Sequence, residues 1–170
     1  MNTQRGSTMF EVLIAVLVLG IGILGVGAMQ ALSLSSNHTA SMRSQAVALT
    51  DDMSDRMRAN LTAARATAPN NYATVAAANN NCRAIYRTGL VGAPAVCTAT
   101  QMAADDLFDW NDRVAAQLPE GAGTVCIDST PDDALCDGVG VAYAVKVFWT
   151  ERGSRTGPVE ARRFVTTVRP

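Results

Sequence analysis

An uninterrupted apolar run constrains this chain more than any other feature of its sequence. From Val12 to Met29 the sequence reads VLIAVLVLGIGILGVGAM, 18 residues without a polar side chain. A helix rises about 1.5 Å per residue, so a run of this length roughly spans the hydrocarbon core of a membrane. Between Phe10 and Met42 the only charged residue is Glu11. The sequence therefore predicts a lipid-compatible helical segment joined to a water-soluble remainder.

Three interpretations of this run compete: a secretory signal, a plain membrane anchor and a prepilin segment. A secretory signal has a shorter apolar core followed by a small-residue cleavage site, whereas here a helical pattern continues beyond Met29. A plain anchor explains the length but not Glu11, because a carboxylate in an apolar helix is costly and usually has a partner. The position of Glu11 therefore favours the third interpretation.

The stretch RGSTMFEVLIAVLVLGIGILG resembles the N-terminus of type IV prepilins, in which a leader ending in Gly precedes a Glu and an apolar run. The resemblance implies that residues 1–6 are the leader and that a prepilin peptidase cuts between Gly6 and Ser7. It also implies N-methylation of Ser7 and places Glu11 at the fifth mature position. Ser7 departs from the Phe or Met that is usual at the first mature position.

The resemblance and the physics of buried charge together assign a role to Glu11. Burying one charge alone in an apolar filament core would cost several kcal/mol. We therefore expect Glu11 to pair with the terminal amine of a neighbouring subunit and to set the register between subunits. The glycines of the run have two interpretations, close packing of neighbouring helices or local unwinding on assembly, and none of their spacings is GxxxG. They are Gly20, Gly22, Gly25 and Gly27.

Beyond Met29 the pattern becomes amphipathic. Apolar residues recur mostly at three- and four-residue steps, which predicts a helix with one buried stripe. The stripe consists of Leu32, Met42, Ala46, Leu49, Met53, Met57 and Leu61. One helix is expected from about Thr8 to Ala64, with Asp52 and Arg56 pairing on its surface.

The rest of the chain predicts a small α+β head. Leu107, Trp110, Val114 and Leu118 share one face of a helix expected over Asp105–Leu118. Strands are expected within GAGTVCID, over Val139–Trp149 and over Ala161–Arg169, the middle one with an apolar face lying on the long helix. The expected architecture is a long helix packed on a small antiparallel sheet. Its divisions are a leader (1–6), a transmembrane or filament-core half-helix (7–30), an amphipathic half-helix (31–66) and a globular head (67–170).

Four cysteines follow the apolar run, and none belongs to a CxxC pair. An even number of cysteines beyond a membrane segment favours two disulfides in an oxidising compartment over a zinc site. Four cysteines allow three connectivities. We expect Cys82–Cys97 and Cys126–Cys136, because each short segment closes without crossing the core, and each bridge would stabilise by roughly 2–4 kcal/mol.

The remaining polar residues predict neither a catalytic constellation nor a metal site or cofactor. The clusters Asp51/Asp52/Asp55 and Asp105/Asp106/Asp109 are expected on helix surfaces. Asp128–Asp137 lacks the spacing and the position-six glycine of an EF-hand, which leaves a weak calcium site there as the minor alternative. The formal net charge of −1 provides no footprint for nucleic acid, and the Arg162–Arg163 pair is expected at a solvated strand edge. We therefore expect a structural protein and not an enzyme.

Several head motifs extend the resemblance to the minor pilin family PilV, the type IV pilus modification protein. They are MRSQAVALTDDMSDRMRAN, DLFDWNDRVAAQLPEGAGTVC, CDG before a strand, and the terminal TVRP. The resemblance implies a low-abundance subunit that supports pilus assembly, adhesion and twitching motility. It also implies contacts with prepilin peptidase, the inner-membrane assembly platform, other minor pilins, the major pilin and a tip adhesin.

The resemblance also implies a location and leaves alternatives open. The chain would cross the inner membrane once, with its N-terminus cytoplasmic and its head periplasmic, and would then enter the pilus at the cell surface. A minor pseudopilin of a type II secretion system has the same architecture. A DNA-uptake pilin binding DNA through Arg162, Arg163 and Arg169 is the third possibility, which the charge balance disfavours.

Overall fold

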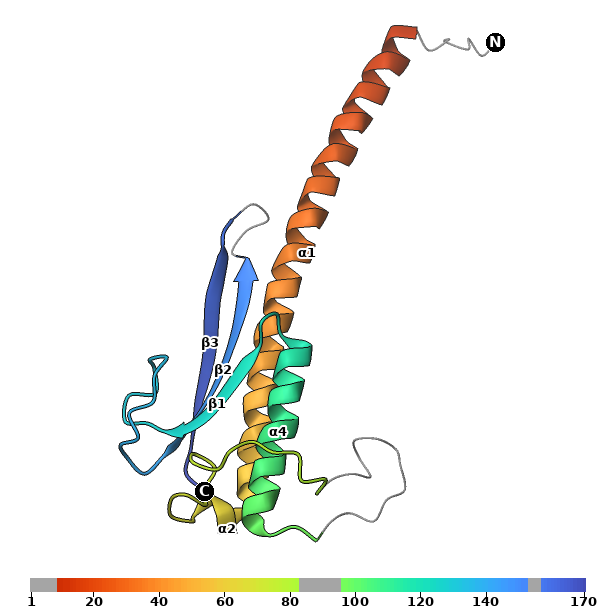
Figure 1. The fold of residues 1–170 in the computed structure, drawn as a ribbon. Coiled ribbons are helices and arrows are strands. Elements are labelled where there is room, and N and C mark those ends of the chain that lie inside the picture. Colours follow the sequence, from red (N-terminus) through yellow and green to blue (C-terminus); the bar gives the residue numbers. More distant parts are fainter. Residues whose placement is uncertain (1–8, 83–95, 153–156) are drawn as a thin grey trace. The chain divides into compact units, whose positions relative to one another are not determined.

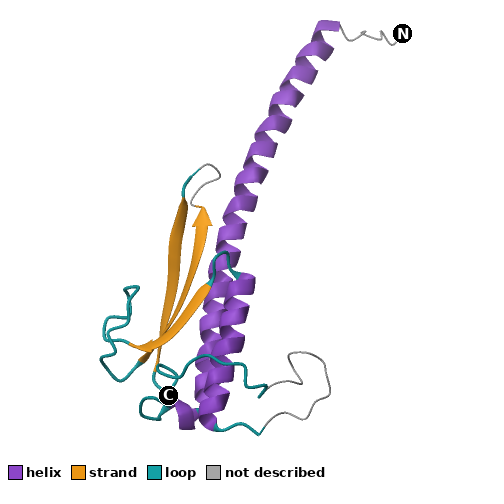
Figure 2. Cartoon of the chain, viewed as in Figure 1, coloured by secondary structure: helices purple, strands orange, loops and turns teal. Residues whose placement is uncertain are grey.

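The computed structural model describes residues 9–82, 96–152 and 157–170, and the chain divides into two compact units, residues 1–40 and 41–170. Three helices and three strands follow one another along the described chain (Figures 1 and 2). They are α1 (Met9–Ala59), α2 (Leu61–Ala64), α4 (Ala99–Gln117), β1 (Ala122–Ile127), β2 (Tyr143–Arg152) and β3 (Val159–Val168). This order confirms the expected α+β class. The leader, Gly6 and Ser7 lie outside the described residues.

The buried stripe of α1 lies in the second unit and largely matches the expectation. Met42, Ala46, Leu49, Met53 and Met57 are all buried in the core of that unit. The expectation was wrong at the two ends of the stripe. Leu32 is 75% exposed and lies in the first unit, and Leu61 is 39% exposed. The stripe therefore begins at Met42, one residue after the second unit begins.

The expected single helix over Thr8–Ala64 ends early because Asn60 interrupts it. α1 stops at Ala59, and the Asn60 side chain accepts a hydrogen bond from the Ala63 backbone N–H, which makes it the N-cap of α2. Asparagine is favoured at this position because its side-chain oxygen satisfies an amide that the new helix leaves without a partner. Asn60 also donates to the Ala99 carbonyl at 2.8 Å, tying this break to the start of α4.

Helix α4 begins six residues before the expected Asp105, at Ala99. Thr98 and Gln101 form a capping box in which each side chain bonds the other residue's backbone N–H. The expected inner face is confirmed. Leu107, Trp110, Val114 and Leu118 are at most 6% exposed.

The three strands form one antiparallel sheet in the order β1-β2-β3. The face of β2 that carries Tyr143, Val145, Val147 and Trp149 lies in the core with α1 and α4, as the alternation predicted. The predicted start of this strand was wrong, because residues 139–142 belong to the loop between β1 and β2. Val139 and Val141 are 60% and 79% exposed, and Gly138 and Gly140 within this loop have φ of 72° and 118°.

Trp110 fills the space between α4, α1 and β1. Its ring is wholly buried, and its indole N–H donates to the Leu49 carbonyl at 2.8 Å. A Cβ on Gly123 would lie 2.3 and 2.4 Å from two ring carbons of Trp110, so β1 passes the ring at a distance that only glycine allows. Such an approach is a common reason for glycine inside a strand.

Candidate functional site

The first unit presents an apolar helix surface headed by one acid. The part of α1 in this unit contains a stretch long and apolar enough to cross a membrane, with none of it buried inside the structure. Glu11 lies in the first turn of α1. From Met9 to Leu34 the large apolar side chains are exposed, between 48% at Ile14 and 88% at Met9. A surface of this kind requires lipid or neighbouring apolar helices around it.

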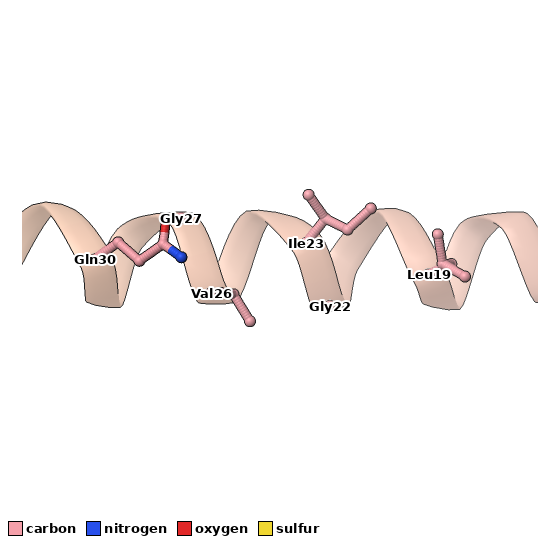
Figure 3. Close-up of a pocket in the computed structure, with 6 residues that line it drawn as sticks. All are labelled: Leu19, Gly22, Ile23, Val26, Gly27 and Gln30. Carbon is pink, nitrogen blue, oxygen red and sulfur yellow. The ribbon is translucent and has the colours of Figure 1, made fainter.

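Two glycines open a shallow apolar groove on this helix. Its lining residues are Leu19, Gly22, Ile23, Val26, Gly27 and Gln30 (Figure 3). A Cβ added at any of the four glycines of the run would meet no atom within 4 Å, so packing inside the chain does not require glycine there. All four lie within continuous helix. Both interpretations of the glycines, close approach by a neighbouring helix and local unwinding on assembly, stay predictions.

The head is closed by two disulfides. Cys82–Cys97 and Cys126–Cys136 have S–S distances of 1.99 and 1.98 Å, and both join partners that are close in the sequence. Cys126, Asp128 and Cys136 lie close enough to share a metal ion, but both sulfurs of this group are already bonded to each other. This group therefore offers one carboxylate and no thiolate ligand.

Arg56 is at the centre of a buried charge network between α1 and α4, which sequence reasoning placed on the helix surface. It is 5% exposed and contacts Asp52 at 3.0 Å, Asp109 at 2.9 Å and Asp106 at 3.5 Å. The expectation that Asp105 and Asp106 are surface residues was wrong, because both are buried.

Both aspartates bond to groups far away in the sequence. The Tyr72 hydroxyl donates to Asp106 at 2.7 Å, and the backbone N–H of Asn80 donates to Asp105 at 2.9 Å. These contacts explain why acidic residues can lie on the inner side of α4. Buried charges are retained where they are paired and hydrogen-bonded.

A second network joins α1 to the hairpin of β2 and β3. The buried Glu151 carboxylate accepts from Arg43 at 2.8 Å and from Arg162 at 2.7 Å. The hydrogen bond from Arg43 is the main reason that the pKa of Glu151 lies below its ordinary value. Arg162 is thus half-buried in an ion pair, whereas Arg163 is exposed and donates to the Asp132 carbonyl. Both arginines lie on the edge strand β3, as expected, and Arg162 remains 39% exposed although it forms an ion pair.

Lys146 is buried on the face of the sheet that points away from the core. Its ammonium is enclosed by the loop that joins β1 to β2, where Asp128 Oδ2 lies 2.5 Å from Nζ. This bond is the main cause of the lowered pKa of Asp128. The alternation of β2 correctly placed Lys146 opposite the core, but its burial had no local signal in the sequence.

Comparisons with known proteins agree with this geometry. Residues 1–27 match the prokaryotic N-terminal methylation motif, and residues 28–108 match the Tt1218-like family of type IV pilins. No curated protein and no solved structure matches the chain. The motif implies processing by a prepilin peptidase and assembly with other pilins, and pilins are structural subunits. The exposed apolar helix, the disulfide-bonded α+β head and the two matches together support a type IV pilin subunit.

Proposed function

We propose that this chain is a minor pilin of a type IV pilus, of the PilV kind, which helps to initiate pilus assembly and then enters the filament. The observation that carries the proposal is the position of Glu11 in the first turn of a helix whose large apolar side chains are exposed. In the membrane this helix would anchor the subunit, with its head in the periplasm. In the filament it would pack against the helices of the major pilin and of other minor pilins. Contact with a tip adhesin, and roles in adhesion and twitching, would follow from that position.

Glu11 is the residue on which the assembly step depends. Near the end of a membrane helix a carboxylate can reach the hydrated interface. In a filament the same carboxylate enters apolar surroundings, where a cation must accompany it. The amine of a neighbouring subunit, freed by cleavage between Gly6 and Ser7, is such a cation. Pairing would fix how far one helix is displaced along the next.

Glu11→Ala tests this role. We expect the variant to insert in the membrane, to be processed and to fold its head, but to be lost from sheared pili. Asp112→Ala is the matched control, because it removes an exposed head carboxylate and should enter pili normally. Immunoblots of the membrane and sheared-pilus fractions give the ratio of subunit in pili to subunit left in the membrane. Entry of Glu11→Ala at the wild-type level would show that the pairing role is wrong.

Processing is tested separately by mass spectrometry of the mature chain. We expect an N-terminus at Ser7 that carries one methyl group. A mature chain that begins at Met1, or one cut after Met29, would contradict the prepilin interpretation.

The main alternative is a minor pseudopilin of a type II secretion system. Pseudopilin heads of this type often lack disulfides, so the two bridges favour the pilus. A deletion strain that loses surface pili or twitching supports the pilus. One that keeps its pili but loses secreted enzymes supports the secretion system. Binding of DNA at moderate salt would favour an uptake pilin, although loss of the leader leaves 13 basic against 15 acidic residues.

A further inference from the structure

Of the fourteen lysine and arginine residues only one is lysine, and its side chain is wholly buried. Thirteen arginines accompany Lys146, whose side chain is 0% exposed. Four oxygens surround its Nζ: Asp128 Oδ2 and the Leu135 carbonyl at 2.5 Å, the Asp133 carbonyl at 3.0 Å and Asp133 Oδ1 at 3.5 Å. All four belong to residues 128–137, which we call the acidic loop. The lysine that binds them stands outside the loop, on β2.

This oxygen set has the composition of a site for a hard cation. Carboxylate and backbone carbonyl oxygens are the ligands that calcium takes in proteins. The acidic loop carries four carboxylates, at Asp128, Asp132, Asp133 and Asp137, and the ammonium of Lys146 is the cationic group that its four oxygens surround. A compact ammonium with three donors resembles a small cation, whereas a planar guanidinium does not. This difference gives a physical reason for lysine at the one position where its neighbours form a cage.

We propose that the acidic loop is a cation-binding loop whose cation is the tethered ammonium of Lys146. The ammonium turns backbone carbonyls and carboxylates toward one point, as a bound metal ion would. The Cys126–Cys136 disulfide closes the same segment from its two ends. The loop therefore keeps its conformation without any dissolved metal, and removal of the ammonium exposes a site for a divalent cation such as calcium.

Lys146→Met tests the proposal, because methionine keeps most of the apolar stem and removes only the charged end. Thermal unfolding of the full chain is measured in detergent micelles, with either EDTA or 5 mM calcium chloride, which exceeds the dissociation constant of about 1 mM of the weakest extracellular calcium modules. We expect the wild type to unfold at the same temperature in both. We expect Lys146→Met to lose about 5 °C or more in EDTA and to regain at least half of that loss in calcium.

Two control variants separate the fit of the ammonium among the four loop oxygens, which we call the cage, from the effect of a positive charge alone. Lys146→Arg keeps the charge, but we expect it to lose stability that calcium does not restore, because the guanidinium does not fit the cage. Arg163→Ala removes another cation that contacts this loop, through the Asp132 carbonyl, and should show no calcium response. A Lys146→Arg variant as stable as the wild type would overturn the proposal.

Each remaining outcome also decides the question. If Lys146→Met is indifferent to calcium, or if the wild type gains as much from calcium as the variant, the proposal is wrong. If Lys146→Met is recovered only from inclusion bodies, it is refolded with and without calcium. Refolding in calcium alone supports the tethered cation, and failure in both buffers refutes it.

Discussion

Replacing Gly123 by alanine should destabilise the head chiefly at the ring of Trp110, with a milder contact 3.0 Å from Asn111 Oδ1. The new methyl group would lie 2.3 and 2.4 Å from two ring carbons, where ordinary carbon contacts are about 3.5–4.0 Å. Overpacking of this kind costs about 1–3 kcal/mol. Alanine also restricts the unfolded chain, which offsets about 0.4–1 kcal/mol of that cost. We therefore expect a net loss of about 1–2 kcal/mol in the free energy of unfolding.

Trp110→Phe makes the reasoning refutable, because phenylalanine lacks the outer ring that the new methyl group would contact. Alone, this variant should lose about 1 kcal/mol with the indole hydrogen bond and about 1 kcal/mol from the space left behind. In the double variant the alanine methyl group enters that space. The loss should then be smaller than the sum of the two single losses by about 1 kcal/mol.

Urea unfolding of residues 41–170, followed by far-UV circular dichroism, measures all four members of this cycle. Among the described residues, every buried core side chain lies between Met42 and Val168, so this segment carries the core of the head. Losses that add to within about 0.3–0.5 kcal/mol would refute direct contact as the cause.

The other predictions concern hydrogen bonds and charges of the head. Tyr143→Phe removes the hydroxyl that donates to the Ala64 carbonyl at 2.8 Å. The variant should lose about 1 kcal/mol in the free energy of unfolding, measured in urea. Arg56→Met removes one partner of the buried ion pairs between α1 and α4 and should cost about 3–5 kcal/mol. The exposed ion pair of Arg58 with Asp55 should contribute less than about 1 kcal/mol to the free energy of unfolding. A loss in Arg58→Ala as large as that in Arg56→Met would contradict this ranking. Because the folded-state pKa of Glu151 is depressed, its contribution is present above its unfolded pKa, about 4.3, and is lost as the pH falls through the lower folded pKa. When the pH is lowered below about 4, the melting temperature of Glu151→Gln should therefore fall less than that of the wild type.

Local periodicity was enough to predict the main elements of the fold. The stripe from Met42 to Met57 and the alternation from Tyr143 to Trp149 each reflect a single face that must be buried. Alternation alone could not mark the start of β2, because the loop before it also alternates. In that loop the positive φ of Gly138 and Gly140, and the contacts made by Lys146, set the chain path. The early start of α4 did have a local signal, the Thr98–Gln101 capping box.

The candidate site was predictable to a different extent in its two parts. The spacing of Gly6 and Glu11 can be read directly, and the motif match over residues 1–27 agrees with it. Cleavage at Gly6 stays a prediction, because that residue lies outside the described part of the chain. The buried charges were missed for a different reason. Arg56 and Asp106 are 50 residues apart, so no local pattern shows that they meet.

The burial of Lys146 has a practical consequence for anyone who maps this subunit in its assembly. Reagents that target primary amines, such as succinimidyl esters and aldehyde fixatives, need a reachable amino group. The only lysine of the chain is enclosed, which leaves the α-amine of the N-terminus as its other amine. Amine cross-linking would therefore miss the neighbours of the head even where they touch it. Reagents that activate carboxylates have many exposed targets there, such as Asp112, Asp132 and Glu160.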